Sequence, residues 1–229
     1  MSELTTYRLD GSVATVTMDD GKVNVISRRM LGELNAALDL ALADDALVIL
    51  SGRSGVFSAG FDLKELMAGG AMTREVLIGG FKLAERLLSF PKPVVIACTG
   101  HAMAMGVFLV LSGDYRIGAD GPFKIVANEV AIGLTMPHSA TEICRQRLTR
   151  THFNRAVITA ELYTPERAVP AGFLDEVVPP ADVARVASET AARLGKLDLD
   201  AFKNTKLRAR SDTLAALHRA IELDDATFA

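Results

Sequence analysis

Hydrophobic and polar residues alternate along the first twenty positions, and this pattern predicts two antiparallel strands. Residues 4–18 read LTTYRLDGSVATVTM, with Asp10-Gly11 at the centre as a typical hairpin turn. Ser27 is then a candidate N-cap for a helix whose apolar positions recur at helical spacing from Met30 to Leu42. The chain is therefore expected to open with a hairpin and a helix that has one apolar face.

Short apolar runs and amphipathic segments alternate through the middle of the chain. Residues 47–51 and 94–98 are predicted to be buried strands, because they are short and apolar throughout. Helical spacing predicts helices over residues 73–88 and 104–112. Alternation of this kind is typical of an α/β fold.

The last third of the chain is dominated by helical patterns, with one strand candidate at residues 173–178. We expect four longer helices over residues 137–148, 151–160, 181–194 and 199–228. A boundary near Gly195 divides an α/β core, residues 1–195, from a C-terminal helical region, residues 196–229.

Composition and charge narrow the class of protein. A hydrophobic fraction of 49% in 229 residues is enough for a sizeable core. The net charge of −3, without long runs of one sign, predicts neither nucleic acid nor a membrane as partner. The N-terminus shows no signal-peptide pattern and no stretch is long enough to span a membrane, so we expect a soluble, cytoplasmic protein. Cys98 and Cys144 are expected to be reduced core residues, and no residue set has the spacing of a metal site.

Two corners rich in small residues lie between strands and helices. The first is VFSAGFDLKEL, residues 56–66, and the second is GHAMAMGV, residues 100–107. Each corner can direct a backbone N–H group into one pocket, although small residues are also common in ordinary turns. A pair of such donors is what a thioester oxygen needs when it becomes an enolate.

Three stretches resemble the signature segments of the crotonase (enoyl-CoA hydratase/isomerase) superfamily in order and spacing. They read FSAGFDLKEL, GHAMAMGVFLVLSGDYRI and NEVAIGLTMP, and the resemblance extends over essentially the whole chain. It implies a crotonase-type spiral of strand–helix turns whose C-terminal helices serve in trimerisation, as a homotrimer or a dimer of trimers. It also implies an acyl-CoA substrate, with coenzyme A as part of the substrate and no other cofactor.

The resemblance assigns roles to individual residues. The amides of Phe61 and Met105 would form the oxyanion hole, although glycine is common in the family at the second position. Glu129 would be the catalytic acid and base, and its apolar neighbours are expected to raise its pKa. An ion pair with a basic residue is the alternative for this carboxylate.

The remaining expected site residues would contact coenzyme A or the acyl group. They are Lys22, Val23, Ala59, Gly60, Asp62, Leu63, Gly106 and Phe108. A basic cluster in the last helices would contact a phosphate or simply be solvated, and comprises Lys203, Lys206, Arg208 and Arg210. Asp114 is expected to be a turn former and not a catalyst. His101 and His138, near the pocket, are expected to be structural, with assistance in acid–base catalysis as the alternative.

Phe108 is the departure with the largest consequence for function. It stands where hydratases of the family have a second glutamate, and phenylalanine cannot orient water or carry a proton. Isomerases of the family move one proton with a single glutamate, and Asn128 and the placement of Pro137 also resemble that branch. The sequence therefore predicts isomerisation of 3-enoyl-CoA to 2-enoyl-CoA. The alternatives are a hydratase that works despite Phe108, and an acyl-CoA-binding protein without catalysis.

Overall fold

The computed structural model describes residues 3–228. Its largest sheet has six strands in the order β1-β2-β4-β7-β9-β11. The opening hairpin is confirmed, since β1 and β2 pair antiparallel with Asp10 opposite Val13, whereas the other pairings in this sheet are parallel. The strands are β1 (Thr5–Asp10), β2 (Val13–Met18), β4 (Leu47–Ser51), β7 (Val94–Cys98), β9 (Tyr115–Ala119) and β11 (Glu176–Val178).

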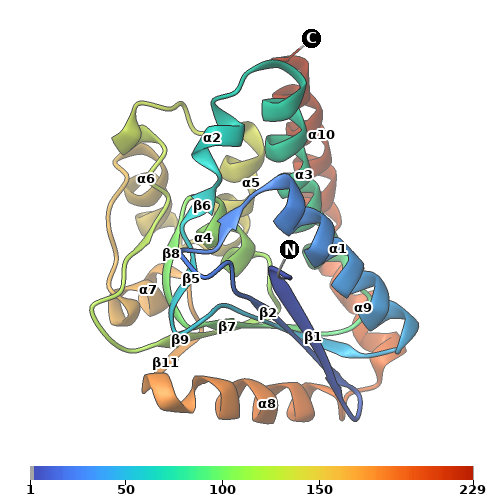
Figure 1. The fold of residues 1–229 in the computed structure, drawn as a ribbon. Coiled ribbons are helices and arrows are strands. Elements are labelled where there is room, and N and C mark those ends of the chain that lie inside the picture. Colours follow the sequence, from blue (N-terminus) through green and yellow to red (C-terminus); the bar gives the residue numbers. More distant parts are fainter. Residues whose placement is uncertain (1–2, 229) are drawn as a thin grey trace.

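Helices cover both faces of this sheet, and α8 (Val183–Leu194) lies alone below it in Figure 1. Ile49 and Val95 point to the α8 side, while their neighbours Val48 and Ile96 point to the main core. Successive side chains of a strand face opposite sides of the sheet, so these central strands are apolar at every position. On the other face lie α1 (Arg28–Ala43), α3 (Gly70–Ser89) and α4 (Met105–Leu111).

Two small sheets stand beside the large one and carry the predicted corners. One has the order β10-β8-β5 and the other pairs β3 with β6, all in parallel. Their strands are β3 (Val25–Ile26), β5 (Gly55–Ser58), β6 (Gly60–Phe61), β8 (Gly100–Met103) and β10 (Ile125–Val126). For β5, β6 and β8 the hydrophobic pattern predicted corners and not strands, because segments of two to four residues are too short to show alternation.

The other helices belong to the second half of the chain, apart from the short α2 (Leu63–Leu66). They are η1 (Val130–Ile132), α5 (His138–Arg147), α6 (Arg150–Ile158), α7 (Pro165–Ala171), η2 (Pro180–Asp182), α9 (Leu199–Ala209) and α10 (Ser211–Ala226). No helix of the described chain is long and apolar enough to cross a membrane.

Two details of the helix predictions were wrong. Residues 199–228 form two helices and not one, because the backbone leaves the helical conformation at Arg210, whose side chain bonds the carbonyl oxygen of Leu88 at 2.8 Å. In α1, Leu42 is 43% exposed, and Ala41 takes the inward position. The predicted N-cap is confirmed, since Ser27 Oγ accepts a hydrogen bond from the Met30 amide at 3.2 Å.

The last helix packs on the body of the same chain. α10 contacts α3 and α5, and Leu217 and Ile221 belong to the main hydrophobic core. Packing within one chain does not test whether residues 196–229 serve in trimerisation or whether a domain boundary lies at residue 195. Both stay predictions.

Asp114 is the centre of a buried ion-pair cluster, which corrects its expected role as a simple turn former. Its Oδ2 accepts from the Val94 amide at 2.8 Å and from Lys206 Nζ at 2.7 Å, and its Oδ1 lies 3.0 Å from Arg210 Nη2. Burial lowers the pKa of Lys206 to about 8 despite this carboxylate. Two members of the basic cluster are thus internal cations that join the C-terminal helices to β7 and β9.

Asp114→Asn is expected to lower the free energy of unfolding by about 3–5 kcal/mol, because it leaves two cations in a mostly buried site without a carboxylate. Urea denaturation of the two proteins measures the difference. Asp200→Asn, at an exposed position of α9, is the matched control. Equal losses in both variants would contradict the central role of Asp114.

Candidate active site

An apolar pocket of about 450 Å³ opens where the two corners meet α3 and the segment before α5. Its lining includes only a few polar side chains, chiefly Glu129, Asn128, Thr73 and Thr135. The apolar part of the wall is formed by Ala59, Phe61, Leu63, Leu66, Leu77, Phe81, Met103, Ala104, Ile132, Leu134, Pro137 and Phe228. A pocket of this size and composition is suited to a small molecule with a hydrocarbon part.

The first corner is held by backbone pairing with the turn that precedes α1. The amide of Ala59 donates to the Val23 carbonyl at 2.9 Å, and that of Asp62 donates to the Ile26 carbonyl at 3.1 Å. Where β3 and β6 are paired, the amide next to that of Asp62 points to the opposite side, so the Phe61 N–H faces away from β3. An oxyanion donor must not be paired within a sheet, and the Phe61 N–H meets this condition with respect to β3.

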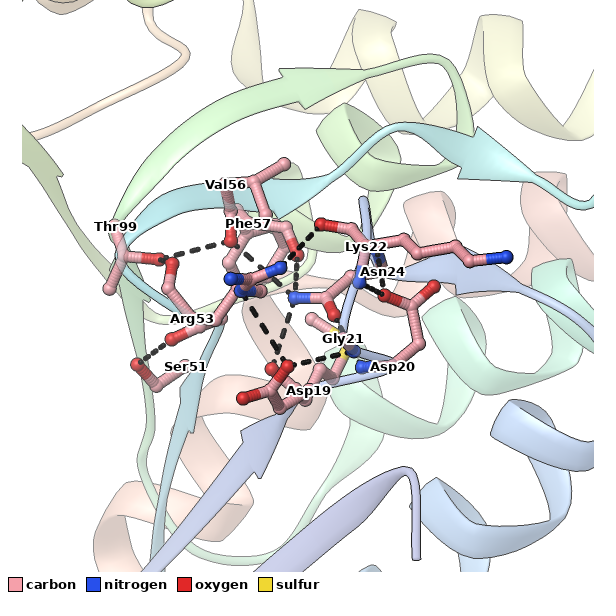
Figure 2. A network of polar contacts seen from close by, with 12 residues as sticks. Asp19, Asp20, Gly21, Lys22, Asn24, Ser51, Arg53, Val56, Phe57 and Thr99 are labelled. Carbon is pink, nitrogen blue, oxygen red and sulfur yellow. Dashed lines mark hydrogen bonds and ion pairs between the residues drawn. The ribbon is translucent and has the colours of Figure 1, made fainter. Parts of the chain in front are cut away.

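A polar network fixes the turn of residues 19–25 against this corner (Figure 2). Asp20 accepts hydrogen bonds from the amides of Lys22, Asn24 and Val25 at 2.7–3.0 Å. The buried Asn24 adopts a positive φ of 53° and donates through Nδ2 to the carbonyls of Met18 and Phe57.

The same network leaves the residues expected to contact coenzyme A at the surface. Arg53 donates to the Lys22 carbonyl at 2.9 Å, whereas the Lys22 side chain extends away from the network in Figure 2. Val23 is 47% exposed. A rigid turn therefore presents Lys22 and Val23 to solvent beside the first corner.

The second corner enters α4 through an unusual backbone conformation at Ala104. Its φ of 47° and ψ of −124° lie where residues other than glycine are rare. Such conformations cost on the order of 1–3 kcal/mol and cluster at functional sites. Met105 follows as the first helical residue, so its N–H has no partner within the helix.

The two corners approach each other at Gly60. A Cβ atom added there would lie 2.7 Å from Ala104 Cβ, 3.0 Å from the Met103 oxygen and 3.3 Å from the Met105 nitrogen. Gly60 also has a φ of 98°, so glycine is required both by the backbone and by the close contact. The structure thus brings the amides of Phe61 and Met105 to neighbouring positions.

Glu129 is a buried carboxyl group at the pocket wall, immediately before η1. It is 6% exposed, and its Oε2 has no hydrogen-bond partner among residues 3–228. Burial raises the pKa of Glu129 to about 7, so the group exchanges a proton near neutral pH. The alternative of an ion pair with a basic residue is not realised within the described chain.

Asn128 places a second polar group in the same pocket. Its Oδ1 is buried and lacks a hydrogen-bond partner among the described residues. Buried polar atoms without partners are rare, and they are frequently completed by a ligand or water. The two adjacent side chains together form a polar position in an otherwise apolar wall.

The structure separates the expected binding residues into two groups. Ala59, Phe61, Leu63 and Glu129 line the pocket. Three more support it: Gly60 and Gly106 allow close approach, and Asp62 is the N-cap of α2 through the Lys64 and Glu65 amides.

Phe108 lies in the core and not in the pocket lining. It is fully buried, and its ring centroid is 6.2 Å from that of Phe81, which does line the pocket. Its expected direct contact with substrate is therefore not seen in this arrangement. Met105 likewise contributes its backbone, because its side chain is buried beside Gly80.

The side chain of His101 has structural contacts, whereas the contact at His138 is made by its backbone and leaves the role of its side chain a prediction. His101 Nδ1 accepts from the Lys124 amide at 2.9 Å, and its ring packs on Phe123. The His138 amide donates to Asp224 at 2.9 Å. Within residues 3–228, no group of histidine, cysteine and acidic residues is placed to hold a metal ion.

A family model described as enoyl-CoA hydratase/isomerase matches residues 8–229. The chain belongs to the enoyl-CoA hydratase/isomerase family. The predicted crotonase-type α/β fold is confirmed as well, because solved crotonase structures superimpose on nearly the whole chain.

Some relatives of this enoyl-CoA hydratase/isomerase family protein are named hydratases and others are named isomerases. A crystal structure of a family protein from Pseudomonas syringae has a TM-score of 0.97 and 46% identity, covering 99% of this chain and 98% of that one. Human mitochondrial delta3-delta2-enoyl-CoA isomerase has a TM-score of 0.93 and 29% identity, with coverages of 98% and 90%. A probable enoyl-CoA hydratase of Mycobacterium avium is 33% identical over 93% of this chain and 83% of its own length.

Several pocket residues were not anticipated. Thr73, Leu77 and Phe81 come from one face of α3, which the helical spacing predicted without showing what the face would contact. Phe228 reaches the pocket from the other end of the chain, and no local signal in the sequence indicates that contact.

Glu129→Gln is expected to increase the free energy of unfolding at pH 8 by on the order of 3 kcal/mol. The pKa of Glu129 is about 7 in the folded protein, against 4.5 for the ordinary group. The preference of the folded state for the protonated carboxyl group therefore contributes stability below pH 4.5, and this contribution is lost as pH rises through 7. Glutamine removes this loss.

Urea denaturation at pH 5 and pH 8 tests this, and the gap between the proteins should shrink at the lower pH. The exposed Glu222→Gln is the control. A gap that does not change with pH would show that Glu129 is not held with a raised pKa.

Proposed function

We propose that this protein isomerises 3-enoyl-CoA to 2-enoyl-CoA. The observation that carries the proposal is a single buried carboxyl group, Glu129, with an unpartnered oxygen in the pocket that the two corners border. Its pKa near 7 suits a group that must both accept and return a proton at neutral pH.

In the proposed reaction, the Glu129 carboxylate takes a proton from C2 of the 3-enoyl thioester. The electrons of that C–H bond form a C1–C2 double bond and the carbonyl π electrons move to the thioester oxygen, while the C3–C4 double bond is retained. When C4 is later protonated by the C3–C4 electrons, the C1–C2 electrons become the C2–C3 double bond and the carbonyl group is restored. The amides of Phe61 and Met105 donate hydrogen bonds to this oxygen, which stabilises the dienolate. Glu129 then returns the same proton to C4, so the reaction needs no cofactor beyond the coenzyme A of the substrate.

The absence of a second carboxyl group in the pocket lining favours isomerisation over hydration. Hydration requires one group to orient water and another to handle its second proton. Among the described residues, Glu129 is the one acid that lines the pocket, and Phe108 is buried in the core beside it. Asn128 can hold water but cannot carry a proton at neutral pH.

Glu129→Gln is expected to lower kcat on a 3-enoyl-CoA by about 10²–10⁴-fold, the usual contribution of a general acid–base group. In the wild type, kcat/KM should fall about tenfold per pH unit below pH 7 and level off above it, since the carboxylate form is the base. Product analysis on paired 3-enoyl and 2-enoyl thioesters measures both reactions.

The surface variant Glu222→Gln should behave as wild type in this assay. A change of only a few fold in Glu129→Gln would refute the role of Glu129. Efficient hydration of a 2-enoyl-CoA, not improved by Phe108→Glu, would identify a hydratase instead. Acyl-CoA binding without turnover of either thioester would indicate a binding protein.

Gly60→Ala is expected to lower kcat by about 10²–10³-fold, because the new methyl group pushes the two corners apart and misplaces an amide donor. Steady-state kinetics on a 3-enoyl-CoA measures the effect. Gly11→Ala is the control for positive φ alone, since Gly11 has a φ of 56° but open space around its Cβ position. Comparable losses in both variants would mean that strain, and not the distance between the corners, causes the effect.

A further inference from the structure

The end of the last helix is attached to two walls of the pocket through adjacent aspartates. Asp224, 4% exposed, accepts from the His138 amide at 2.9 Å and from the Ser139 amide and hydroxyl at 2.9 and 2.6 Å. Asp225 accepts from Arg74 Nε and Nη2 at 2.5 and 2.7 Å. One aspartate thus caps the first turn of α5, and the other forms a two-pronged ion pair with α3.

Both attachment points are next to residues that line the pocket. Arg74 lies between Thr73 and Leu77 of α3, and His138 follows Pro137, and these three neighbours belong to the lining. Phe228 comes three residues after Asp225 and lines the same pocket. Figure 1 shows the C-terminal end of α10 at the same end of the molecule as α2, which carries Leu63 and Leu66.

The part of the ligand that Phe228 would meet is assigned by elimination among the lining residues. Ala59 and Leu63 form the side where coenzyme A is expected, and Glu129 marks the reacting carbons. The rest of the lining includes the apolar side chains of Leu77, Pro137 and Phe228. If the protein binds acyl-CoA as proposed above, the acyl tail runs along this part of the lining, toward the end of α10.

We infer that Phe228 limits the length of the acyl chain that the pocket accepts, and that Asp224 and Asp225 hold it in that position. The inference rests on the proposed function for the identity of the ligand. The segment that carries the ring cannot move away from α3 and α5 without breaking those bonds, since Asp224 would then be left buried and unpaired. The backbone that positions Phe228 at the pocket is therefore fixed.

The test is the affinity for saturated acyl-CoAs, which bind without reacting. Calorimetry with butyryl-CoA and decanoyl-CoA gives two Kd values for wild type, Phe228→Ala and Phe228→Trp. Each additional methylene that is buried lowers Kd by about fourfold. If Phe228→Ala makes space for about two or three more, the Kd for decanoyl-CoA divided by that for butyryl-CoA should be lower than in wild type by about tenfold or more. Phe228→Trp should shift the ratio the other way.

Leu223→Ala is the matched control, since Leu223 is on the same helix, 54% exposed and outside the pocket lining. A ratio of Kd values unchanged within threefold in Phe228→Ala, or an equal shift in Leu223→Ala, would overturn the inference. A wild type that binds both acyl-CoAs but turns over no 3-enoyl-CoA refutes the proposed function alone. A wild type that binds neither refutes both.

Discussion

The contact between the two corners is the constraint on which the site depends. Gly60 has no room for a side chain against Ala104 and Met105, and Gly106 has none against Ser58, where an added Cβ would lie 2.4 Å from the backbone oxygen. Two amides from segments more than forty residues apart are neighbours because these backbones touch. Most of the small residues in both corners are explained by that contact and not by turn formation alone.

The corners are held rigidly by groups that have no chemical role. The turn of residues 19–25 satisfies its own amides through Asp20 and connects to the first corner through Asn24. Ser58 contributes as well, because its hydroxyl donates to the Asn24 carbonyl at 2.7 Å. On the second corner, the strained conformation of Ala104 is maintained by α4, which is buried along its whole length. Preorganised donors of this kind are effective because they need no rearrangement during the reaction.

Burial has opposite consequences at two acidic residues. Asp114 is surrounded by cations and joins the C-terminal helices to the sheet, so its charge contributes to stability. Glu129 has no such partner among the described residues, so its charge is destabilising while its raised pKa makes proton transfer possible near neutral pH. The fold thus tolerates an unpaired carboxyl group at the position where the proposed reaction needs one.

Local patterns in the sequence were enough for much of the fold. The hairpin at Asp10-Gly11, the buried strands and most helix positions were predicted from turn residues and apolar spacing over short stretches of the chain. The family and Glu129 were accessible because three short stretches carry them. The arrangement of the site could not be predicted from local patterns, because a strand of two residues such as β6 is too short to show an alternation of apolar and polar positions.

Contacts distant in sequence decided the rest. Lys206 and Arg210 looked like solvated or phosphate-binding residues, but they face a carboxylate some ninety residues earlier in the chain. Phe108 looked like a pocket residue, and Phe228 did not look like one, because the direction of a helical side chain depends on how its helix packs. The sequence by itself determined the residue types and the order of the elements. Only the tertiary structure decided which of them meet, since burial and pairing depend on neighbours that the chain brings together when it folds.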